Sequence, residues 1–72
     1  MAEEGIDPIT KAVAQIRFIQ PYQATKWYLC PGCNTEIPPG TGHFVVVPID
    51  NIELRRHWHR RCLNWETEHG RI

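Results

Sequence analysis

The chain has 72 residues and a formal net charge of zero, because eight Lys and Arg residues balance eight Asp and Glu residues. A chain of this length forms one domain at most, and it buries too small a fraction of its surface to be stable on a hydrophobic core alone. The charge balance argues against a strongly basic nucleic-acid-binding protein, and no apolar run approaches the roughly 18 residues that cross a membrane.

The first part of the chain predicts an arm followed by two strands. Residues 1–11 are polar and predict a flexible N-terminal arm, which leaves residues 12–72 as a single domain. Residues 12–20 fit either a strand or one face of a helix, and their β-branched and aromatic content favours a strand that ends at Pro21. Residues 25–29 predict a second strand, which leads directly into the first cysteine.

The second part predicts a hairpin and a helix. Residues 36–42 contain two prolines and two glycines, which are typical of a turn region. Residues 43–47 are the clearest strand, and a further strand over residues 53–58 completes a hairpin. After this hairpin the apolar period changes and predicts a short helix over about residues 60–69. The expected fold class is therefore a small α+β domain with antiparallel β-hairpins and one short C-terminal helix.

All three cysteines and one histidine fall into two pairs with the spacing of metal ligands. The pairs are Cys30-Pro31-Gly32-Cys33 and His59-Arg60-Arg61-Cys62. An odd number of cysteines would leave one thiol over in a disulfide framework, whereas three thiolates and one imidazole complete the tetrahedral ligand set of structural zinc. We therefore predict one Zn²⁺ per chain, bound by Cys30, Cys33, His59 and Cys62, in a metal-stabilised fold with a zinc knuckle.

Residues beside the ligands support this assignment and leave one alternative open. Gly32 supplies the small residue that the tight turn of a knuckle needs, and Asn34 suits the left-handed conformation that often follows the second cysteine. His57 and His59 would lie on the same side of a strand, so either imidazole could turn toward the metal. The H-x2-C spacing favours His59.

The cysteines also bear on location. Reduced thiols favour a cytoplasmic protein, because disulfides are rare in that compartment. The N-terminal residues Met1-Ala2-Glu3-Glu4 lack the basic start and apolar run of a signal peptide. We expect a cytoplasmic protein with no membrane partner.

Around the ligands the sequence resembles treble-clef and LIM-like zinc modules, which often read C-x2-C, I-x-x-G, a β-hairpin and then W-H-x-x-C. The corresponding residues are Cys30 and Cys33, Ile37-Pro38-Pro39-Gly40, Val45-Val46-Val47, and Trp58-His59 with Cys62. The likeness covers residues 27–65 and implies a treble-clef or zinc-ribbon-like architecture around one zinc. A LIM domain would carry a second zinc half, so LIM function is not transferred. The finer pattern is similar to a group of small uncharacterised actinobacterial proteins.

The first functional hypothesis is a protein-interaction or adaptor module whose partner the sequence does not identify. The ligand set is closed, the net charge is zero, and aromatic side chains are numerous for so small a domain. Such side chains make good interface anchors. We expect Trp58 and Trp65 to lie in the core, and Trp27 or Tyr28 to be more exposed.

The alternative hypothesis is a nucleic-acid-binding zinc module. Four arginines lie within seven positions around the second ligand pair and make the local field positive: Arg55, Arg56, Arg60 and Arg61. Together with Trp27 stacking on a base, they would form a phosphate-facing patch. An affinity that falls steeply with added salt would distinguish this hypothesis from the first.

A metalloenzyme is the least favoured hypothesis. Catalytic zinc keeps one coordination position for water, whereas this ligand set is complete. The chain has no H-E-x-x-H motif and no deaminase motif, and its length leaves little wall for a substrate pocket. We expect no catalytic residue and no small-molecule substrate.

Overall fold

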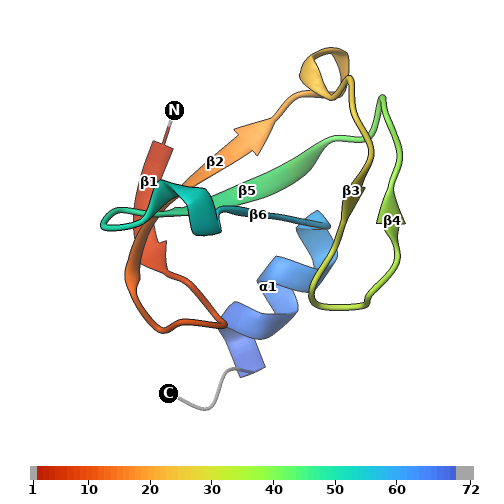
Figure 1. Cartoon of the computed structure of the whole chain (residues 1–72). Coiled ribbons are helices and arrows are strands. Elements are labelled where there is room, and N and C mark those ends of the chain that lie inside the picture. Colours follow the sequence, from red (N-terminus) through yellow and green to blue (C-terminus); the bar gives the residue numbers. More distant parts are fainter. Residues whose placement is uncertain (1, 70–72) are drawn as a thin grey trace.

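A four-stranded antiparallel sheet forms the centre of the structure (Figure 1). The structure is a computed structural model and describes residues 2–69. Its strands, in spatial order, are β1 (Ala2–Ile6), β2 (Val13–Ile19), β5 (His43–Pro48) and β6 (Arg56–Trp58). A separate antiparallel pair consists of β3 (Tyr28–Leu29) and β4 (Glu36–Ile37). The helix α1 (Arg60–His69) follows β6, and two 3₁₀ turns, η1 (Pro21–Gln23) and η2 (Ile52–Leu54), lie in the connections. Within the described residues, no helix is long and apolar enough to cross a membrane.

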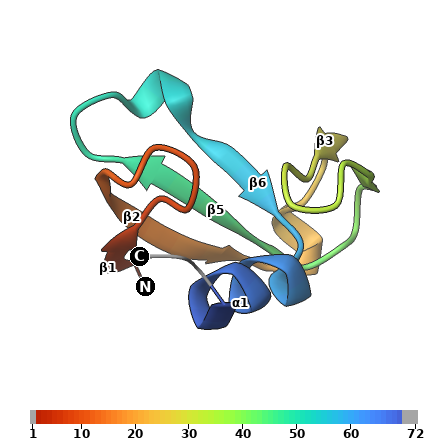
Figure 2. The same ribbon diagram turned by 90° about the horizontal axis from the view of Figure 1, so that it is seen from below.

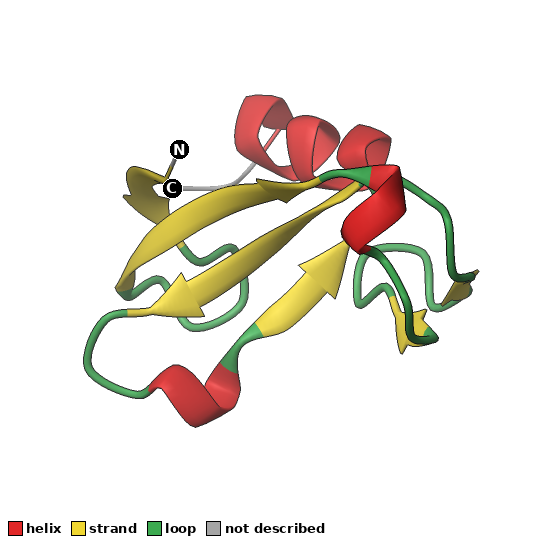
Figure 3. Ribbon diagram, turned by 90° about the horizontal axis from the view of Figure 1, so that it is seen from above, coloured by secondary structure: helices red, strands yellow, loops and turns green. Residues whose placement is uncertain are grey.

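The helix α1 packs against one face of the four-stranded sheet (Figure 3). The strand registers place Ile16 opposite Val46 and Phe44 opposite Trp58, so these four side chains share that face. Leu63 of α1 packs against them. The buried cluster consists of Ala14, Cys30, Ile37, Val46, Trp58 and Leu63. The β3–β4 region lies beside the end of β6 (Figure 2). Since two members of the cluster come from this region, the core extends from the helix–sheet interface into the small hairpin.

The prediction of a flexible arm over residues 1–11 was wrong for Ala2–Ile6, which form β1 and pair with β2. Met1 lies outside the described residues. The turn between the two strands is held by Asp7, whose carboxylate accepts hydrogen bonds from the backbone N–H groups of Ile9 (2.8 Å) and Thr10 (3.2 Å). The backbone N–H of Asp7 donates to the carbonyl oxygen of Ala12 at 2.9 Å and closes the turn. A polar edge strand carries little apolar periodicity, so the sequence pattern alone did not reveal it.

Most of the other predicted elements are confirmed, and three differ from the prediction by more than one residue at an end. The strand over residues 12–20, the hairpin that pairs β5 with β6 and the C-terminal helix are all present. The strand predicted over residues 53–58 begins only at Arg56, because η2 precedes it. The strand predicted over residues 25–29 is limited to β3, and the turn region over residues 36–42 contains β4.

The three tryptophans differ sharply in burial. Trp58 is 2% exposed and lies at the centre of the core, as predicted. Trp65 is 50% exposed, so its predicted core position was wrong, and Trp27 is 62% exposed, as expected. The i, i+3 spacing that places Trp65 near Cys62 does not by itself turn the indole ring inward.

Replacing Trp58 by Ala should lower the free energy of unfolding by about 3–5 kcal/mol, because it leaves a large cavity in the core. Replacing Trp65 by Ala should cost less than about 1 kcal/mol, since that side chain is half exposed. Urea denaturation at a fixed free zinc concentration, followed by circular dichroism, measures both values. Equal losses for the two variants would show that Trp58 is not the centre of the core.

Candidate metal centre

Four potential metal ligands converge from two separate parts of the chain. Cys30, Cys33, His59 and Cys62 each offer one ligand atom, and these four atoms all lie within 4.8 Å of one another. The first two residues occupy the connection between β3 and β4, and the other two lie where β6 leads into α1 (Figure 1). The cluster is therefore close enough to bind one metal ion.

The first pair sits in a tight turn that has the features of a knuckle. The backbone N–H of Asn34 donates to the carbonyl oxygen of Cys30 at 2.8 Å, and the N–H of Cys30 donates to the carbonyl oxygen of Thr35 at 3.0 Å. Asn34 takes a φ of 62°, the left-handed conformation that the sequence predicted for it. This conformation reverses the chain, so that both sulfurs face the second pair.

Gly32 is required for a further reason, namely its close approach to the core. A Cβ atom at this position would lie 2.9 Å from Cζ3 of Trp58 and 3.1 Å from Cβ of Cys62. Both distances are shorter than ordinary contacts between carbon atoms. The turn therefore rests directly on the buried indole ring, and the position tolerates no side chain without displacement of the ligand turn.

The second pair is positioned by the end of β6 and the first turn of α1. The helix begins with a hydrogen bond from the N–H of Leu63 to the carbonyl oxygen of His59, at 3.0 Å, which turns Cys62 toward the cluster. Nδ1 of His59 lies 3.2 Å from Sγ of Cys33 and 3.9 Å from Sγ of Cys62, so Nδ1 is the ring nitrogen that faces the sulfurs. The backbone N–H of His59 donates to Sγ of Cys30 at 3.4 Å.

The thiols have very different proton affinities. Hydrogen bonds from Thr35, whose hydroxyl lies 2.8 Å from the sulfur, lower the pKa of the Cys33 thiol to about 6. Burial, and then the neighbouring Cys33 and Cys30 sulfurs, raise the pKa of Cys62 to about 12. Cys30 is fully buried. Charging all three sulfurs so close together requires a cation among them, and a metal ion supplies that charge.

His57 takes part in a different network. Its Nδ1 lies 2.8 Å from Nε2 of His43, and Nδ1 of His43 lies 2.8 Å from the carbonyl oxygen of Thr41. A carbonyl oxygen only accepts, so His43 donates from Nδ1, and its Nε2 then accepts from the Nδ1–H of His57. The ring of Tyr28 stacks on His57 with centroids 3.5 Å apart and planes at 11°. The structure thus places His59 among the four potential metal ligands and leaves His57 outside this group.

Burial, then electrostatic interaction with His43 and with the guanidinium of Arg55, lower the pKa of His57 to about 4. The imidazole therefore stays neutral near pH 7 and keeps the tautomer that its bond to His43 requires. Tyr28 and His57 each precede a ligand pair by two residues, Cys30 in one case and His59 in the other. Their stacked rings thus tie the strand that enters the first pair to the strand that enters the second.

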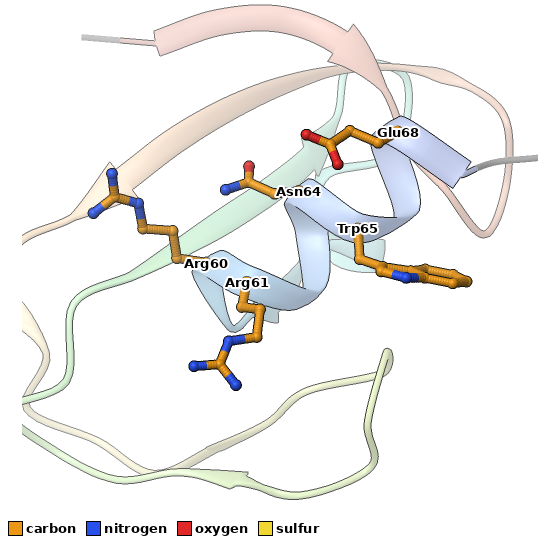
Figure 4. Close-up of a pocket in the computed structure, with 5 residues that line it drawn as sticks. All are labelled: Arg60, Arg61, Asn64, Trp65 and Glu68. Carbon is orange, nitrogen blue, oxygen red and sulfur yellow. The ribbon is translucent and has the colours of Figure 1, made fainter.

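The four arginines of the predicted patch have different surroundings in the structure. Arg60 and Arg61 line a surface cavity of about 520 Å³ with Asn64, Trp65 and Glu68 (Figure 4). The side chains of Arg55 and Arg56 bond instead to backbone carbonyl oxygens near their own positions, those of Ile52 and Leu54. The aromatic residue beside Arg60 and Arg61 is Trp65, whereas Trp27 does not line this cavity.

Two contributors to the site were not identified from the sequence. Thr35 follows the second cysteine by two residues, a position from which its hydroxyl reaches back to the sulfur. The contact between Gly32 and Trp58 joins residues far apart in sequence, and local spacing cannot reveal it. Only the role of Thr35 had a signal in the sequence, because it is a hydroxyl residue that follows a knuckle cysteine by two positions.

Residues 9–66 match the sequence profile of the family described as Rv1322 family protein. The chain belongs to the Rv1322 family. Relatives in Mycobacterium tuberculosis and Mycobacterium bovis, both named as uncharacterized proteins, are 44% identical to it over 52 residues. These alignments cover 67% of this chain and 53% of each relative, so the chain spans about half the length of the curated relatives it matches. No solved structure matches the chain.

Replacing His59 by Ala should lower metal affinity by more than about 100-fold, because it removes a direct ligand rather than an outer partner. Replacing His57 by Ala should leave one metal per chain, although the lost stack and hydrogen bond will reduce stability. Competition with a chelator, followed by elemental analysis of the purified chain, measures both effects. The reverse result would move the ligand by two residues, from His59 to His57.

Replacing Thr35 by Val should raise the pKa of Cys33 toward its ordinary value, because the thiolate loses its hydroxyl donor. Protons then compete with the metal for Cys33, so affinity near pH 7 should fall by about tenfold. The deficit should shrink as the pH rises above the raised pKa, where Cys33 is a thiolate in both proteins. Threonine-to-serine replacement at this position is the control, since it keeps the hydroxyl. A deficit that persists unchanged at high pH would contradict this role.

Proposed function

We propose that the Rv1322-family chain is a zinc-stabilised module in which a Cys3His zinc has a structural role. The observation that carries this proposal is the convergence of Cys30, Cys33, His59 and Cys62 within 4.8 Å. Thiolate and imidazole ligands suit zinc, and four such ligands complete a tetrahedral site. One Zn²⁺ per chain and no open coordination position follow from this ligand set.

The hydrophobic core is small enough to make such an ion necessary. In the part of the chain that the structure describes, only a few apolar side chains are fully buried, and Cys30 and Ile37 are the ones that the β3–β4 region contributes. Domains of this size need a metal, disulfides or a partner to offset the conformational entropy of folding. A zinc ion bound by both ligand pairs would attach the hairpin to the sheet and the helix.

The order of the elements supports a treble-clef arrangement. A knuckle between β3 and β4 provides one ligand pair, the β5–β6 hairpin follows, and the start of α1 completes the second pair. The sequence likeness to treble-clef modules runs through the same residues. We therefore propose this architecture as the finer description of the small α+β fold.

The module is proposed to act by binding another protein in the cytoplasm, and not as an enzyme. A closed zinc site leaves no position for a reacting water. Several large apolar and aromatic side chains are exposed, including those of Tyr22, Trp27, Leu29 and Trp65. Exposed aromatic residues are favoured anchors of protein interfaces.

Nucleic-acid binding by Arg55, Arg56, Arg60 and Arg61 stays a prediction. In Figure 4 the side chains of Arg60 and Arg61 point to different sides of α1. Glu68 lines the same cavity and places a negative charge near any bound phosphate. These features support the protein-interaction hypothesis more than a shared phosphate site.

Removal of zinc should abolish cooperative folding, because the binding energy of a structural zinc is folding energy. Native mass spectrometry before and after a strong chelator, with circular dichroism alongside, measures zinc content and structure together. Replacing Cys62 by Ser should give the same loss without chelator, and replacing Asn64 by Ser on the exposed side of α1 should not. A metal-free chain that still unfolds cooperatively would overturn the structural role.

A further inference from the structure

A second recess lies between β1 and α1, away from the metal centre. This acidic groove has a volume of about 410 Å³. Its apolar floor consists of Ile16, Phe44 and Leu63, and its rim carries Glu3, Glu4 and Glu66. Lys11 is the single cation among the residues that line it, so the groove is net acidic. The net charge of the whole chain is zero, so it gives no indication of this local negative field.

The groove runs beside an open edge of the sheet. β1 is the outermost strand and pairs only with β2, so its outer backbone groups have no partner strand in the described part of the chain (Figure 1). Such an edge is a template for an added strand. Gly5 has no side chain that could cover Ile16, and a Cβ atom at this position would lie only 2.6 Å from Cδ1 of Ile16.

Charge argues against a second copy of this chain as the occupant. Pairing of β1 with β1 of another copy would bring the carboxylates of Glu3 and Glu4 close to their own duplicates, and like charges across a strand pair are destabilising. The opposite sheet edge, β6, offers Arg56 but has no apolar side chain to fill the groove, because Trp58 is already buried. A partner for this groove must bring both positive charge and an apolar side chain.

We propose that the acidic groove binds a basic peptide segment in extended conformation, added as a strand along β1. One large apolar side chain of the peptide packs on Ile16, Phe44 and Leu63. Because side chains alternate along a strand, a Lys or Arg two residues away shares that face and lies near Glu3 and Glu66, whereas an adjacent Lys or Arg lies near Glu4 on the opposite face. The backbone of the peptide pairs with the outer edge of β1. This inference rests on the proposed protein-interaction function, and it specifies the surface and the chemistry of the partner.

The test uses the full zinc-loaded chain, labelled with ¹⁵N, and two synthetic peptides. In the first, a central Leu has Lys or Arg at the positions one and two residues away on either side, so that basic side chains lie on both faces of the strand, and in the second Glu replaces every Lys and Arg. The basic peptide should shift the amide resonances of β1, Ile16, Phe44 and the middle of α1, and it should slow hydrogen exchange in β1. Replacing Glu3 and Glu66 together by Lys should weaken its binding about tenfold and should let the acidic peptide bind.

The matched control is Glu68→Lys, which changes a carboxylate of the same helix that does not line the groove. A further variant, Glu66→Lys alone, is compared with this control. Equal effects of these two single replacements, or equal binding of the two peptides by the unchanged chain, would overturn the proposal. A dimer of the peptide-free chain in sedimentation, together with slowed hydrogen exchange of the same β1 amides, would also overturn it. Peptide shifts confined to Trp27 or Trp65 would reject the groove but keep the interaction function. A chain that stays folded without bound zinc would reject the structural-zinc function instead.

Discussion

The convergence of three sulfurs and one imidazole is the constraint on which the rest of this structure depends. Cys30 and Cys33 belong to a hairpin whose two strands have two residues each, which is too short to be stable alone. His59 and Cys62 belong to the junction of sheet and helix. The separation of the four ligand atoms leaves space for one ion, and the ion would neutralise thiolates that otherwise repel one another.

The ligand cluster and the hydrophobic core form one unit, joined by Trp58. The indole ring of Trp58 is buried beneath Gly32, and the backbone of Trp58 pairs with that of Phe44 in the sheet. Loss of the metal would therefore release the turn that covers the ring, and loss of the ring would remove the support of the turn. Coupling of this kind makes the folding of a small metal-binding domain cooperative.

The two faces of the four-stranded sheet have different physical roles. On the helix side, apolar contacts among Ile16, Val46 and Leu63 exclude water. On the other side, His43 and His57 form a hydrogen-bonded pair against Tyr28, and each of the buried ring nitrogens at their contact has a partner. Such a polar network is stable only when its groups are satisfied, so it fixes the position of β3 more specifically than apolar contact alone.

The sequence by itself determined the ligand pairs, the turn at Asn34, the β5–β6 hairpin and the helix after His59. These features depend on short spacings and on local conformational preferences, which a single sequence records directly. The tertiary structure decided the rest: which histidine joins the cluster, the exposure of Trp65 and the pairing of β1. Each of these depends on contacts between distant segments, and neither apolar period nor ligand spacing carries that information.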